Sequence, residues 1–336
     1  MSQIKLTKKD FATDQEVRWC PGCGDYAILS VTQQVFPTLG IPRENFVIVS
    51  GIGCAARFPY YMNVYGFHTV HGRAPTIATG IKITNPDLSV WIVSGDGDAL
   101  SIGGNHLIHI MRRNVDVKFL LFDNQIYGLT KGQYSPTSEM GKKTKSTPFG
   151  SVDRPFNPLA LALGAGATFV ARSVDVFTPH LKQTLIDAHG HRGTAFVQIY
   201  QNCNIFNDGA FDGFREKKRR DDNTLSLKHG EPLLFGKNQD RGIRVNGQFR
   251  PEVVELGNGV TEKDLLVHDE QGPIGYLAML AELAPPNFPL PIGVLRRVER
   301  PTFDASVRSQ IAEITEDQGA GDLRKLLHSG QTWTVK

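Results

Sequence analysis

The stretch Gly95-Asp96-Gly97-Asp98, followed later by Asn124-Gln125-Ile126-Tyr127-Gly128, decides the fold of this chain. Short apolar runs at 90–94 and 117–122 precede these two stretches. Runs of this length and composition are typical of buried parallel strands. The pattern at 101–114 predicts a helix between them. The region therefore predicts one strand–helix–strand unit, with a polar turn after each strand.

The two turns hold groups that suit a metal and a diphosphate. Parallel neighbours bring Asp96 and Asn124 to the same carboxyl edge of the sheet, where open α/β folds bind ligands. Gly95 and Gly97 let the backbone approach a phosphate and offer it N–H groups. The Asp96 carboxylate, the Asn124 amide oxygen and the Ile126 carbonyl are ligands that Mg²⁺ prefers. Either turn alone would more often be an ordinary turn at the end of a strand. The two turns together, at this spacing, predict a magnesium–diphosphate site.

Repeated strand and helix patterns extend this unit into a larger α/β fold. Further strands are predicted at 46–50, 167–172 and 195–200, and further helices at 157–165 and 178–189. This alternation predicts a doubly wound, mostly parallel sheet.

The domain organisation follows from where these patterns begin and end. Residues 1–16 are polar and predict an extended arm, and residues 17–215 predict one ligand-binding domain. The patterns fade in residues 216–336, which we expect to form an irregular extension that contacts a partner.

Composition excludes some classes of protein. The 336 residues are 40% hydrophobic and 21% charged, which is ordinary for a globular enzyme. A net charge of only +3 argues against general nucleic-acid binding. The sequence contains no apolar run long enough for a membrane span, and its beginning lacks the apolar core of a signal peptide. We therefore expect a cytoplasmic protein.

The four cysteines all fall in predicted turns. Cys20 and Cys23 form a Cys-x-x-Cys turn, whereas Cys54 and Cys203 each follow a predicted strand and should lie at the ligand edge. In a cytoplasmic chain, such cysteines are more often thiols or metal ligands than disulfides. Their spacing alone is compatible with structural zinc, a 4Fe–4S cluster or no metal.

The sequence resembles a known family at these positions. A Gly-Asp-Gly followed at this spacing by Asn resembles the magnesium–thiamine diphosphate motif. The run at 126–137 resembles the β subunits of 2-oxoacid:ferredoxin oxidoreductases, in particular the 2-oxoglutarate type. The resemblance covers residues 15–215, approximately, and fades beyond 235. It implies a thiamine diphosphate-binding fold with a diphosphate-type domain and an irregular C-terminal extension.

The resemblance also implies the cofactors and their ligands. Mg²⁺ would be held by Asp96, Asn124 and Ile126, and a 4Fe–4S cluster by Cys20, Cys23, Cys54 and Cys203. Thiamine diphosphate would contact the residues of the surrounding turns, which are Ile52, Gly53, Cys54, His71, Gly95, Asp96, Gly97, Asp98, Asn124, Ile126, Tyr127, Gly128 and Leu129.

Three residues carry the substrate prediction. Leu129 and Lys131 follow the Asn124 turn and should lie over the thiazolium. Pyruvate-using relatives tend to have Asn at the position of Leu129. Lys131 and Arg57 would pair with the second carboxylate of 2-oxoglutarate through charge-assisted hydrogen bonds. The alternatives are a solvated loop lysine for Lys131 and a surface ion pair for Arg57.

The implied activity is the reversible oxidative decarboxylation of 2-oxoglutarate to succinyl-CoA and CO₂, with electrons passing through the cluster to ferredoxin. Thiamine enzymes also need a glutamate from a pyrimidine-binding domain. We find no second α/β pattern in this sequence long enough to form that domain. The family supplies it from a separate α subunit, so we expect an αβ or α2β2 enzyme. Two alternatives remain: a β subunit for pyruvate or a broad range of 2-oxoacids, and a zinc-stabilised, non-redox subunit that binds thiamine diphosphate.

Overall fold

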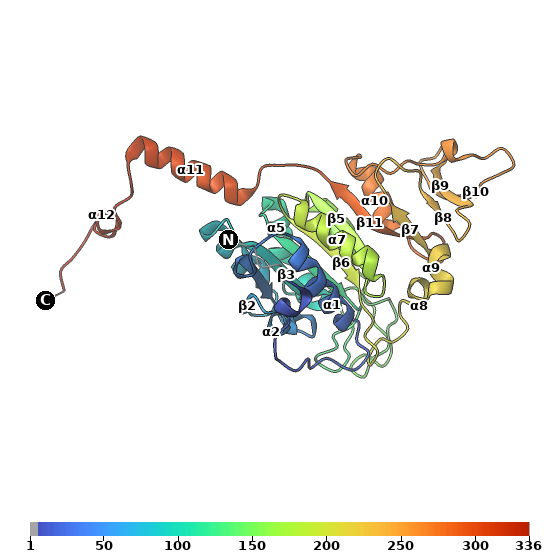
Figure 1. Ribbon diagram of the computed structural model, residues 1–336, viewed down its shortest axis with the longest axis horizontal. Coiled ribbons are helices and arrows are strands. Elements are labelled where there is room, and N and C mark those ends of the chain that lie inside the picture. The colour runs from blue at the N-terminus through green and yellow to red at the C-terminus, as the bar shows by residue number, and fades with distance from the viewer. Residues whose placement is uncertain (1–5, 336) are drawn as a thin grey trace.

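An eight-stranded sheet, here called the main sheet, forms the centre of the computed structural model, which describes residues 6–335 (Figure 1). Its strand order is β2-β1-β3-β4-β6-β5-β11-β7, and every neighbouring pair is parallel except β11 with β5. This confirms the predicted mostly parallel sheet. The strands are β1 (Phe46–Ser50), β2 (Tyr65–His68), β3 (Ser89–Gly95), β4 (Lys118–Asp123), β5 (Phe169–Val174), β6 (Ala195–Tyr200), β7 (Thr224–Leu227) and β11 (Leu290–Arg297).

The predicted strand–helix–strand unit lies at the centre of this sheet. Strands β3 and β4 are parallel neighbours, with Gly95 in register with Phe122. The turns that follow them therefore start side by side at one edge. The segment between the strands holds two helices rather than the single one predicted: α4 (Asp96–Leu100) and α5 (Gly104–Arg113). The helix breaks because Ser101, with φ −92° and ψ −106°, is not helical.

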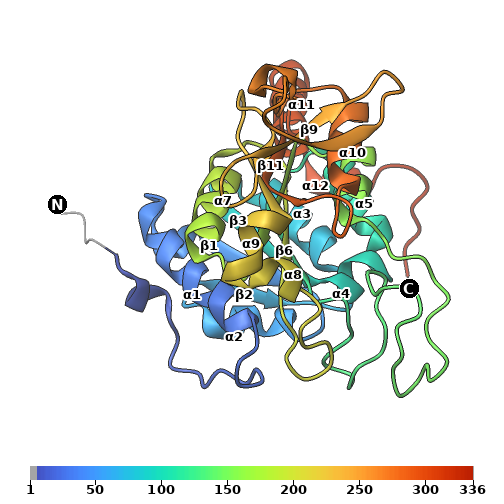
Figure 2. The same ribbon diagram turned by 90° about the vertical axis from the view of Figure 1, so that its right-hand side faces the viewer.

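Helices cover both faces of the main sheet, as a doubly wound fold requires (Figure 2). One face packs against α1 (Asp25–Val35) and α7 (Thr178–Gly190), and the other against α3 (Ala74–Thr84), α5, α6 (Pro158–Gly164) and α10 (Ile274–Glu282). Each face buries its own hydrophobic cluster. The fully buried β1, β4 and β5 show why continuous apolar runs predicted these strands. The strand predicted at 167–172 lies two residues later, at β5.

The C-terminal region is more regular than the irregular extension that we predicted. Strand β11 pairs antiparallel with β5 and parallel with β7, so this region completes the main sheet. Sequence patterns missed this because the pairing is long-range. The remaining elements are the short helices α8 (Asp212–Arg215) and α9 (Lys217–Asn223), and a small antiparallel sheet of β8 (Leu234–Phe235), β9 (Arg241–Val245) and β10 (Pro251–Glu255).

The described part of the N-terminal segment also differs from the predicted extended arm; residues 1–5 lie outside the described chain. Residues Lys8–Phe11 form a short 3-10 helix. Phe11 is fully buried, and its ring packs edge-on against Phe36 and Phe46, with centroids 5.7 Å away in both cases. One aromatic residue is thus enough to fix a segment that is otherwise polar.

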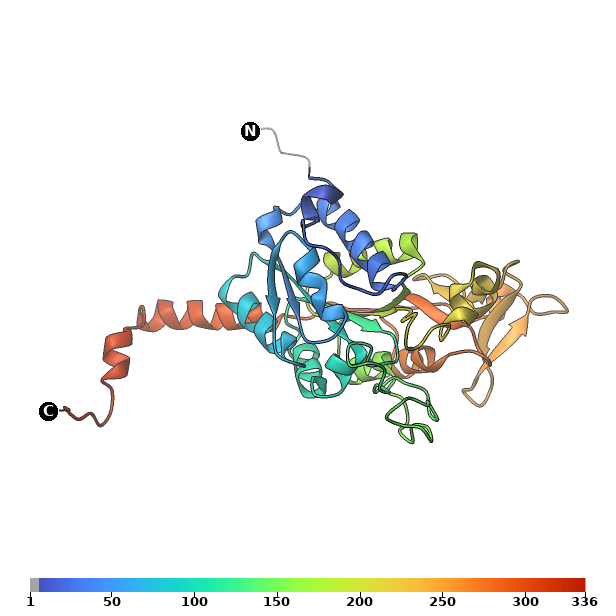
Figure 3. The same cartoon turned by 90° about the horizontal axis from the view of Figure 1, so that it is seen from below.

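Helices α11 (Phe303–Gln318) and α12 (Leu323–Leu327) project away from the main sheet (Figures 1 and 3). We call residues 303–335 the C-terminal arm. The arm carries large exposed apolar side chains at Ile311, Ile314, Leu323, Leu326, Leu327 and Trp333. Among the described helices, none is both long enough and apolar enough to cross a membrane.

A buried charge cluster stabilises the edge of the sheet opposite the ligand turns. The Asp116 carboxylate lies 3.2 Å from Lys82 Nζ and 2.9 Å from Lys118 Nζ, and both lysines are at most 6% exposed. Burial by itself raises the pKa of Asp116, but the two ammonium groups outweigh it and hold this pKa at about 2.

Replacing Asp116 with Asn should lower the free energy of unfolding by roughly 3 kcal/mol, because two buried ammonium groups then lose the carboxylate that pairs with both of them. A lowered carboxylate pKa stabilises the fold above the unfolded pKa of about 4, and this contribution is lost as the pH falls towards 2. Urea unfolding at pH 7 and at pH 3 measures both effects. The exposed Asp87→Asn is the control, and equal stability of the two variants at pH 7 would contradict the prediction.

Candidate cofactor site

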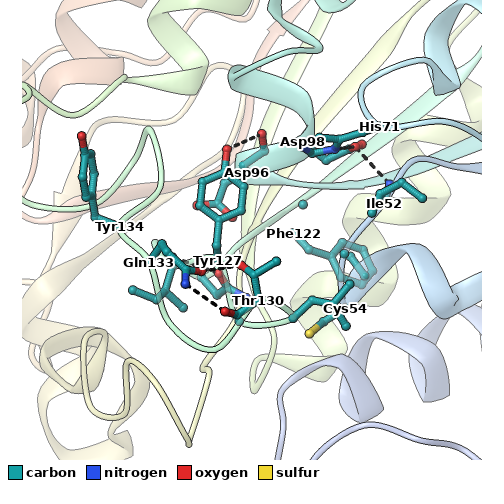
Figure 4. Close-up of a pocket in the computed structure, with 18 residues that line it drawn as sticks. Ile52, Cys54, His71, Asp96, Asp98, Phe122, Tyr127, Thr130, Gln133 and Tyr134 are labelled. Carbon is teal, nitrogen blue, oxygen red and sulfur yellow. Dashed lines mark hydrogen bonds and ion pairs between the residues drawn. The ribbon is translucent and has the colours of Figure 1, made fainter. Parts of the chain in front are cut away.

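A cavity of about 410 Å³ opens at the carboxyl edge of the main sheet (Figure 4). The turns that follow β1, β3 and β4 form its walls. It is lined by Ile52, Gly53, Cys54, Ala55, His71, Gly95, Asp96, Gly97, Asp98, Phe122, Asn124, Ile126, Tyr127, Gly128, Leu129, Thr130, Gln133 and Tyr134. All thirteen residues predicted to contact the cofactor line this one cavity, which we call the cofactor cavity.

Asp96 is the buried acidic group of the cofactor cavity. Its Oδ2 accepts hydrogen bonds from Ser135 Oγ at 2.5 Å and from Thr137 Oγ1 at 2.7 Å. Burial, and then the nearby Asp123, raise the pKa of Asp96 to about 7. A negative charge here therefore lacks sufficient compensation from the protein. This environment suits a carboxylate whose charge is completed by a bound dication.

Glycine at position 97 is required by close packing. A Cβ atom on Gly97 would lie 2.1 Å from the ring of Tyr127. The Tyr127 hydroxyl also donates a hydrogen bond to the Gly97 carbonyl at 3.0 Å. The turn after β3 and the turn after β4 are therefore locked together, which explains why both belong to one motif.

Asp98 organises the rim of the cavity. Its Oδ1 accepts from the backbone N–H of Ile52 at 3.0 Å and of Gly72 at 2.7 Å, and lies 2.5 Å from His71 Nδ1. Its Oδ2 accepts from Ser94 Oγ at 2.5 Å. Oδ1 thus holds the β1 turn and the His71 turn in place (Figure 4), whereas Oδ2 is bonded to the end of β3. Asp98 therefore positions neighbouring residues, chiefly through the three donors that its Oδ1 accepts.

Asn124 also lines the cofactor cavity. Its Oδ1 accepts a hydrogen bond from Ile126 N at 3.1 Å, and its Nδ2 donates to Gln201 Oε1 at 3.0 Å. Asp96, Asn124 and Ile126 line the same cavity, as predicted from the spacing. Their oxygen atoms match the ligand preference of Mg²⁺, which retains part of its shell from water or phosphate.

All four cysteines line a second, adjacent cavity of about 300 Å³, here called the cysteine cavity. The two cavities share Cys54, Asn124, Gly128 and Leu129. A Cβ atom on Gly128 would lie 3.6 Å from the sulfur atoms of both Cys54 and Cys203. Gly128 thus brings the Asn124 turn against two of the thiols, and only this wall separates the cavities.

The Cys-x-x-Cys turn reaches this cavity through contacts that are distant in sequence. Gly24 N donates to Asn202 O at 3.1 Å, and Asn204 Nδ2 donates to Pro21 O at 2.6 Å. These bonds attach the turn to the segment that carries Cys203. The sequence predicted which cysteines lie in turns, but only the tertiary structure brings the turn beside the strand ends.

The environment of the thiols indicates what they can bind. Burial, and then the nearby Asp25, raise the pKa of Cys23 far above its usual range and that of Cys54 to about 12. Thiolates at these positions therefore require a cationic partner. Within residues 6–335, no group of three or more His, Cys, Asp or Glu side chains converges closely enough to hold a single metal ion.

The predicted substrate residues are divided between the two cavities. Leu129 lies in the shared wall and is 39% exposed. Lys131 and Arg57 line the cysteine cavity, not the cofactor cavity. Arg57 Nη1 donates to the Arg18 carbonyl at 2.5 Å. The three side chains are neighbours, but only Leu129 is a wall of the cofactor cavity.

Sequence reasoning missed three functional candidates. Ser135 and Thr137 hold Asp96 from the long loop between β4 and α6. They lie in the run at 126–137 that resembles the family, but nothing local in that run indicates that their hydroxyls bind Asp96. Gln201 follows β6 directly and contacts both Asn124 and Cys23. Its position just after a predicted strand, like that of Asp96, was the one available signal.

Comparisons with known proteins agree with this geometry. Residues 51–199 match the family model of the thiamine pyrophosphate enzyme C-terminal TPP binding domain. The chain is 53% identical over 331 residues to 2-oxoglutarate oxidoreductase subunit KorB of Mycobacterium tuberculosis, a match that spans 97% of this chain and 88% of that protein. It is 47% identical over 190 residues to the β subunit of 2-oxoacid:ferredoxin oxidoreductase 1 of Aeropyrum pernix, covering 56% of this chain and 60% of that protein.

A solved structure shows the same similarity in three dimensions over nearly the whole chain. It is the 2-oxoglutarate:ferredoxin oxidoreductase of Magnetococcus marinus with 2-oxoglutarate, coenzyme A and succinyl-CoA bound. The two chains are 32% identical and superpose with a TM-score of 0.75, covering 97% of each. Both the sequence match to KorB and this structure therefore include the C-terminal region, where we found no motif.

Proposed function

Because this chain belongs to the family of 2-oxoacid:ferredoxin oxidoreductase β subunits, we propose that it is the β subunit of a 2-oxoglutarate:ferredoxin oxidoreductase. The enzyme decarboxylates 2-oxoglutarate oxidatively to succinyl-CoA and CO₂, and the reaction is reversible. Electrons leave through an iron–sulfur cluster to ferredoxin. The observation that supports this best is the single wall, formed by Cys54, Asn124, Gly128 and Leu129, between the cofactor cavity and the cysteine cavity.

The cofactor cavity belongs to a thiamine diphosphate-binding domain. In our proposal Asp96, Asn124 and the Ile126 carbonyl hold Mg²⁺, which in turn holds the diphosphate. Thiamine diphosphate supplies the carbon nucleophile for decarboxylation when it is bound. The chain itself contributes a buried negative charge at Asp96, a fixed amide at Asn124 and a rim held by Asp98.

In the same proposal Cys20, Cys23, Cys54 and Cys203 hold one 4Fe–4S cluster. Two observations support a cluster over structural zinc. The four thiols surround a cavity of about 300 Å³, and the described residues contain no group arranged for a single ion. Structural zinc requires four ligand atoms about 2.0–2.3 Å from one point. The shared wall would place the cluster next to the thiamine, as single-electron transfer requires.

Anaerobic co-expression with an α subunit tests the proposed function. We expect a brown complex that reduces ferredoxin only when 2-oxoglutarate and coenzyme A are both present. Parallel assays with pyruvate and a branched-chain 2-oxoacid measure the substrate preference. A colourless complex that contains zinc, or equal rates with all three oxoacids, would contradict the proposal.

We propose that Leu129 and Lys131, with Arg57, select a dicarboxylic oxoacid. Leu129 forms part of the shared wall, and the two cations line the cavity directly beyond it. A five-carbon oxoacid extending past Leu129 would bring its distal carboxylate towards these cations. Pyruvate lacks this carboxylate and would gain nothing from them.

Replacing Lys131 with Gln should lower kcat/KM for 2-oxoglutarate by roughly tenfold, the order of one charge-assisted hydrogen bond. Most of the loss should appear in KM, and kcat/KM for pyruvate should stay unchanged. The exposed Lys145→Gln is the matched control. An equal decrease in kcat/KM for the two substrates would show that Lys131 does not bind the distal carboxylate.

We propose that residues 17–215 form the cofactor-binding domain and that the C-terminal arm contacts another subunit. Ile311 and Ile314 are 58% and 51% exposed, and Leu323, Leu326 and Leu327 each exceed two-thirds exposure. Apolar surface of this kind on a projecting helix is typical of protein interfaces. The first turn of α11 instead belongs to the body, since Asp304 Oδ1 accepts from Asp116 N at 3.0 Å.

Truncation after Ser309 should therefore weaken assembly with the α subunit and leave the body of the chain folded. We expect the free chain to unfold at an unchanged temperature. Light scattering of the co-expressed complex should show a species with fewer subunits than the wild-type complex. The single variant Gln310→Ala, at an exposed polar position of the same helix, is the control. A truncated complex with the same number of subunits as the wild type would contradict a role of the arm in assembly.

A further inference from the structure

Gln201 lies between the two cavities and contacts a proposed ligand in each. It follows β6 directly and is fully buried. Its Oε1 accepts a hydrogen bond from Asn124 Nδ2 at 3.0 Å, and its Nε2 donates to the sulfur of Cys23 at 3.1 Å. One side-chain amide thus connects a proposed magnesium ligand to a proposed cluster ligand.

The orientation of this amide is fixed. Gln201 Nε2 also donates to the Asn202 carbonyl at 2.7 Å, so both N–H groups point at acceptors. A flipped amide would place its oxygen against that carbonyl oxygen. Gln201 Oε1 must therefore face Asn124, which in turn must present its Nδ2. This fixes which atom of Asn124 is the oxygen: Oδ1 is the atom that accepts from Ile126 N at 3.1 Å, at the turn that lines the cofactor cavity, and its remaining lone pair is available to a metal.

The surrounding backbone holds Gln201 in this position. Its N–H donates to the Asp123 carbonyl at 3.0 Å, which ties the end of β6 to the end of β4. A Cβ atom on Gly24 would lie 2.1 Å from Asp175 Oδ2 and 2.9 Å from Gln201 Cγ, so the glycine after the Cys-x-x-Cys turn makes room for both side chains. These contacts belong to the main-chain framework that carries both sites.

Resting on the proposed function, we propose that Gln201 is a positioning residue that couples the two cofactor sites. Through Asn124 it orients the amide oxygen for the metal. Through Cys23 it donates a hydrogen bond to a cluster thiolate, and such bonds raise the reduction potential because they stabilise the more negative, reduced cluster. The same residue therefore sets both cofactor affinity and the driving force for electron transfer.

Gln201→Met tests this proposal in the anaerobic complex with the α subunit. Met has a similar volume but can neither donate to Cys23 nor accept from Asn124. We expect a more negative cluster midpoint potential in a redox titration followed by electron paramagnetic resonance. We also expect magnesium–thiamine diphosphate to bind the cofactor-depleted complex roughly fivefold to tenfold more weakly, the order of one lost buried hydrogen bond.

Gln33→Met is the matched control. Gln33 is 7% exposed and its Nε2 donates to the Tyr61 carbonyl at 3.1 Å, so the variant also removes a buried amide, but one with no contact to either site. Both readouts should stay at the wild-type values. A Gln201→Met complex with wild-type potential and affinity would overturn the proposal. A change in only one readout, or equal changes in the control, would overturn the coupling.

A second variant keeps the test decisive if Gln201→Met does not retain its iron. Gln201→Leu removes the same donor and acceptor with a different side-chain shape, so cofactor affinity should again fall roughly fivefold to tenfold and the potential should again become more negative. A wild-type potential in this variant would overturn the role at the cluster. The wild-type complex must first show iron–sulfur absorbance and ferredoxin reduction with 2-oxoglutarate. Failure at that step contradicts the proposed function itself, whereas failure in the variants alone contradicts only the role of Gln201.

Discussion

Replacing Asp96 with Asn is expected to lower ferredoxin reduction by roughly a thousandfold, because the metal loses its charged ligand. The same change should not destabilise the chain. The pKa of Asp96 is raised to about 7 without a bound dication, which means that ionising this carboxylate costs stability as the pH rises from about 4 to 7. A neutral amide removes that cost, and Ser135 and Thr137 can still donate to its oxygen.

Two measurements separate these effects. Steady-state kinetics of the complex give the activity, and thermal unfolding of the cofactor-free chain at pH 8 gives the stability. We expect Asp96→Asn to unfold at the same or a higher temperature than the wild type. Asp87→Asn, at an exposed position, should leave both unchanged. An inactive variant that also unfolds at a much lower temperature would show that Asp96 is structural and not a metal ligand.

The chain purified without an α subunit is expected to show no measurable turnover of 2-oxoglutarate. Thiamine enzymes activate the cofactor with a glutamate that faces its aminopyrimidine ring. Within the described part of the chain, the residues that line the cofactor cavity include no glutamate. Adding the α subunit should restore activity, even though the β chain already contains every proposed ligand for Mg²⁺ and the cluster.

Reconstitution provides the measurement. The isolated chain is loaded anaerobically with iron, sulfide, Mg²⁺ and thiamine diphosphate, and ferredoxin reduction is followed before and after the α subunit is added. Iron–sulfur absorbance without turnover, followed by turnover in the complex, is the expected sequence. Oxoacid-dependent ferredoxin reduction by the loaded chain alone would show that its active site is complete.

Much of the cofactor cavity could be predicted from the sequence because its chemistry is local. Asp96 and Asn124 directly follow apolar runs, and parallel pairing of those runs places both residues at one edge. Cys54 and Cys203 reach the same region for the same reason, since β1, β3, β4 and β6 are consecutive neighbours in the main sheet. Predictions that used strand ends as markers were therefore confirmed in position.

Predictions that assumed a side-chain direction were less accurate. Lys131 was expected over the thiazolium, and Arg57 beside the distal carboxylate of the substrate, but both line the cysteine cavity. Asp98 was expected to contact the cofactor, yet its oxygens are used by the backbone of Ile52 and Gly72 and by two side chains. Such directions depend on hydrogen bonds and packing between segments far apart in the chain, and no local pattern encodes them.

The sequence alone thus determined the class of fold, the edge of the sheet that carries the site and the residue types available there. Periodicity and turn chemistry are properties of neighbouring residues, so they can be recognised without a structure. Only the tertiary structure decided that β7 and β11 complete the sheet, that Ser135 and Thr137 hold Asp96, and that Gln201 lies between the two cavities. These are long-range contacts, selected by which folded arrangement buries apolar surface and satisfies buried polar groups at the same time.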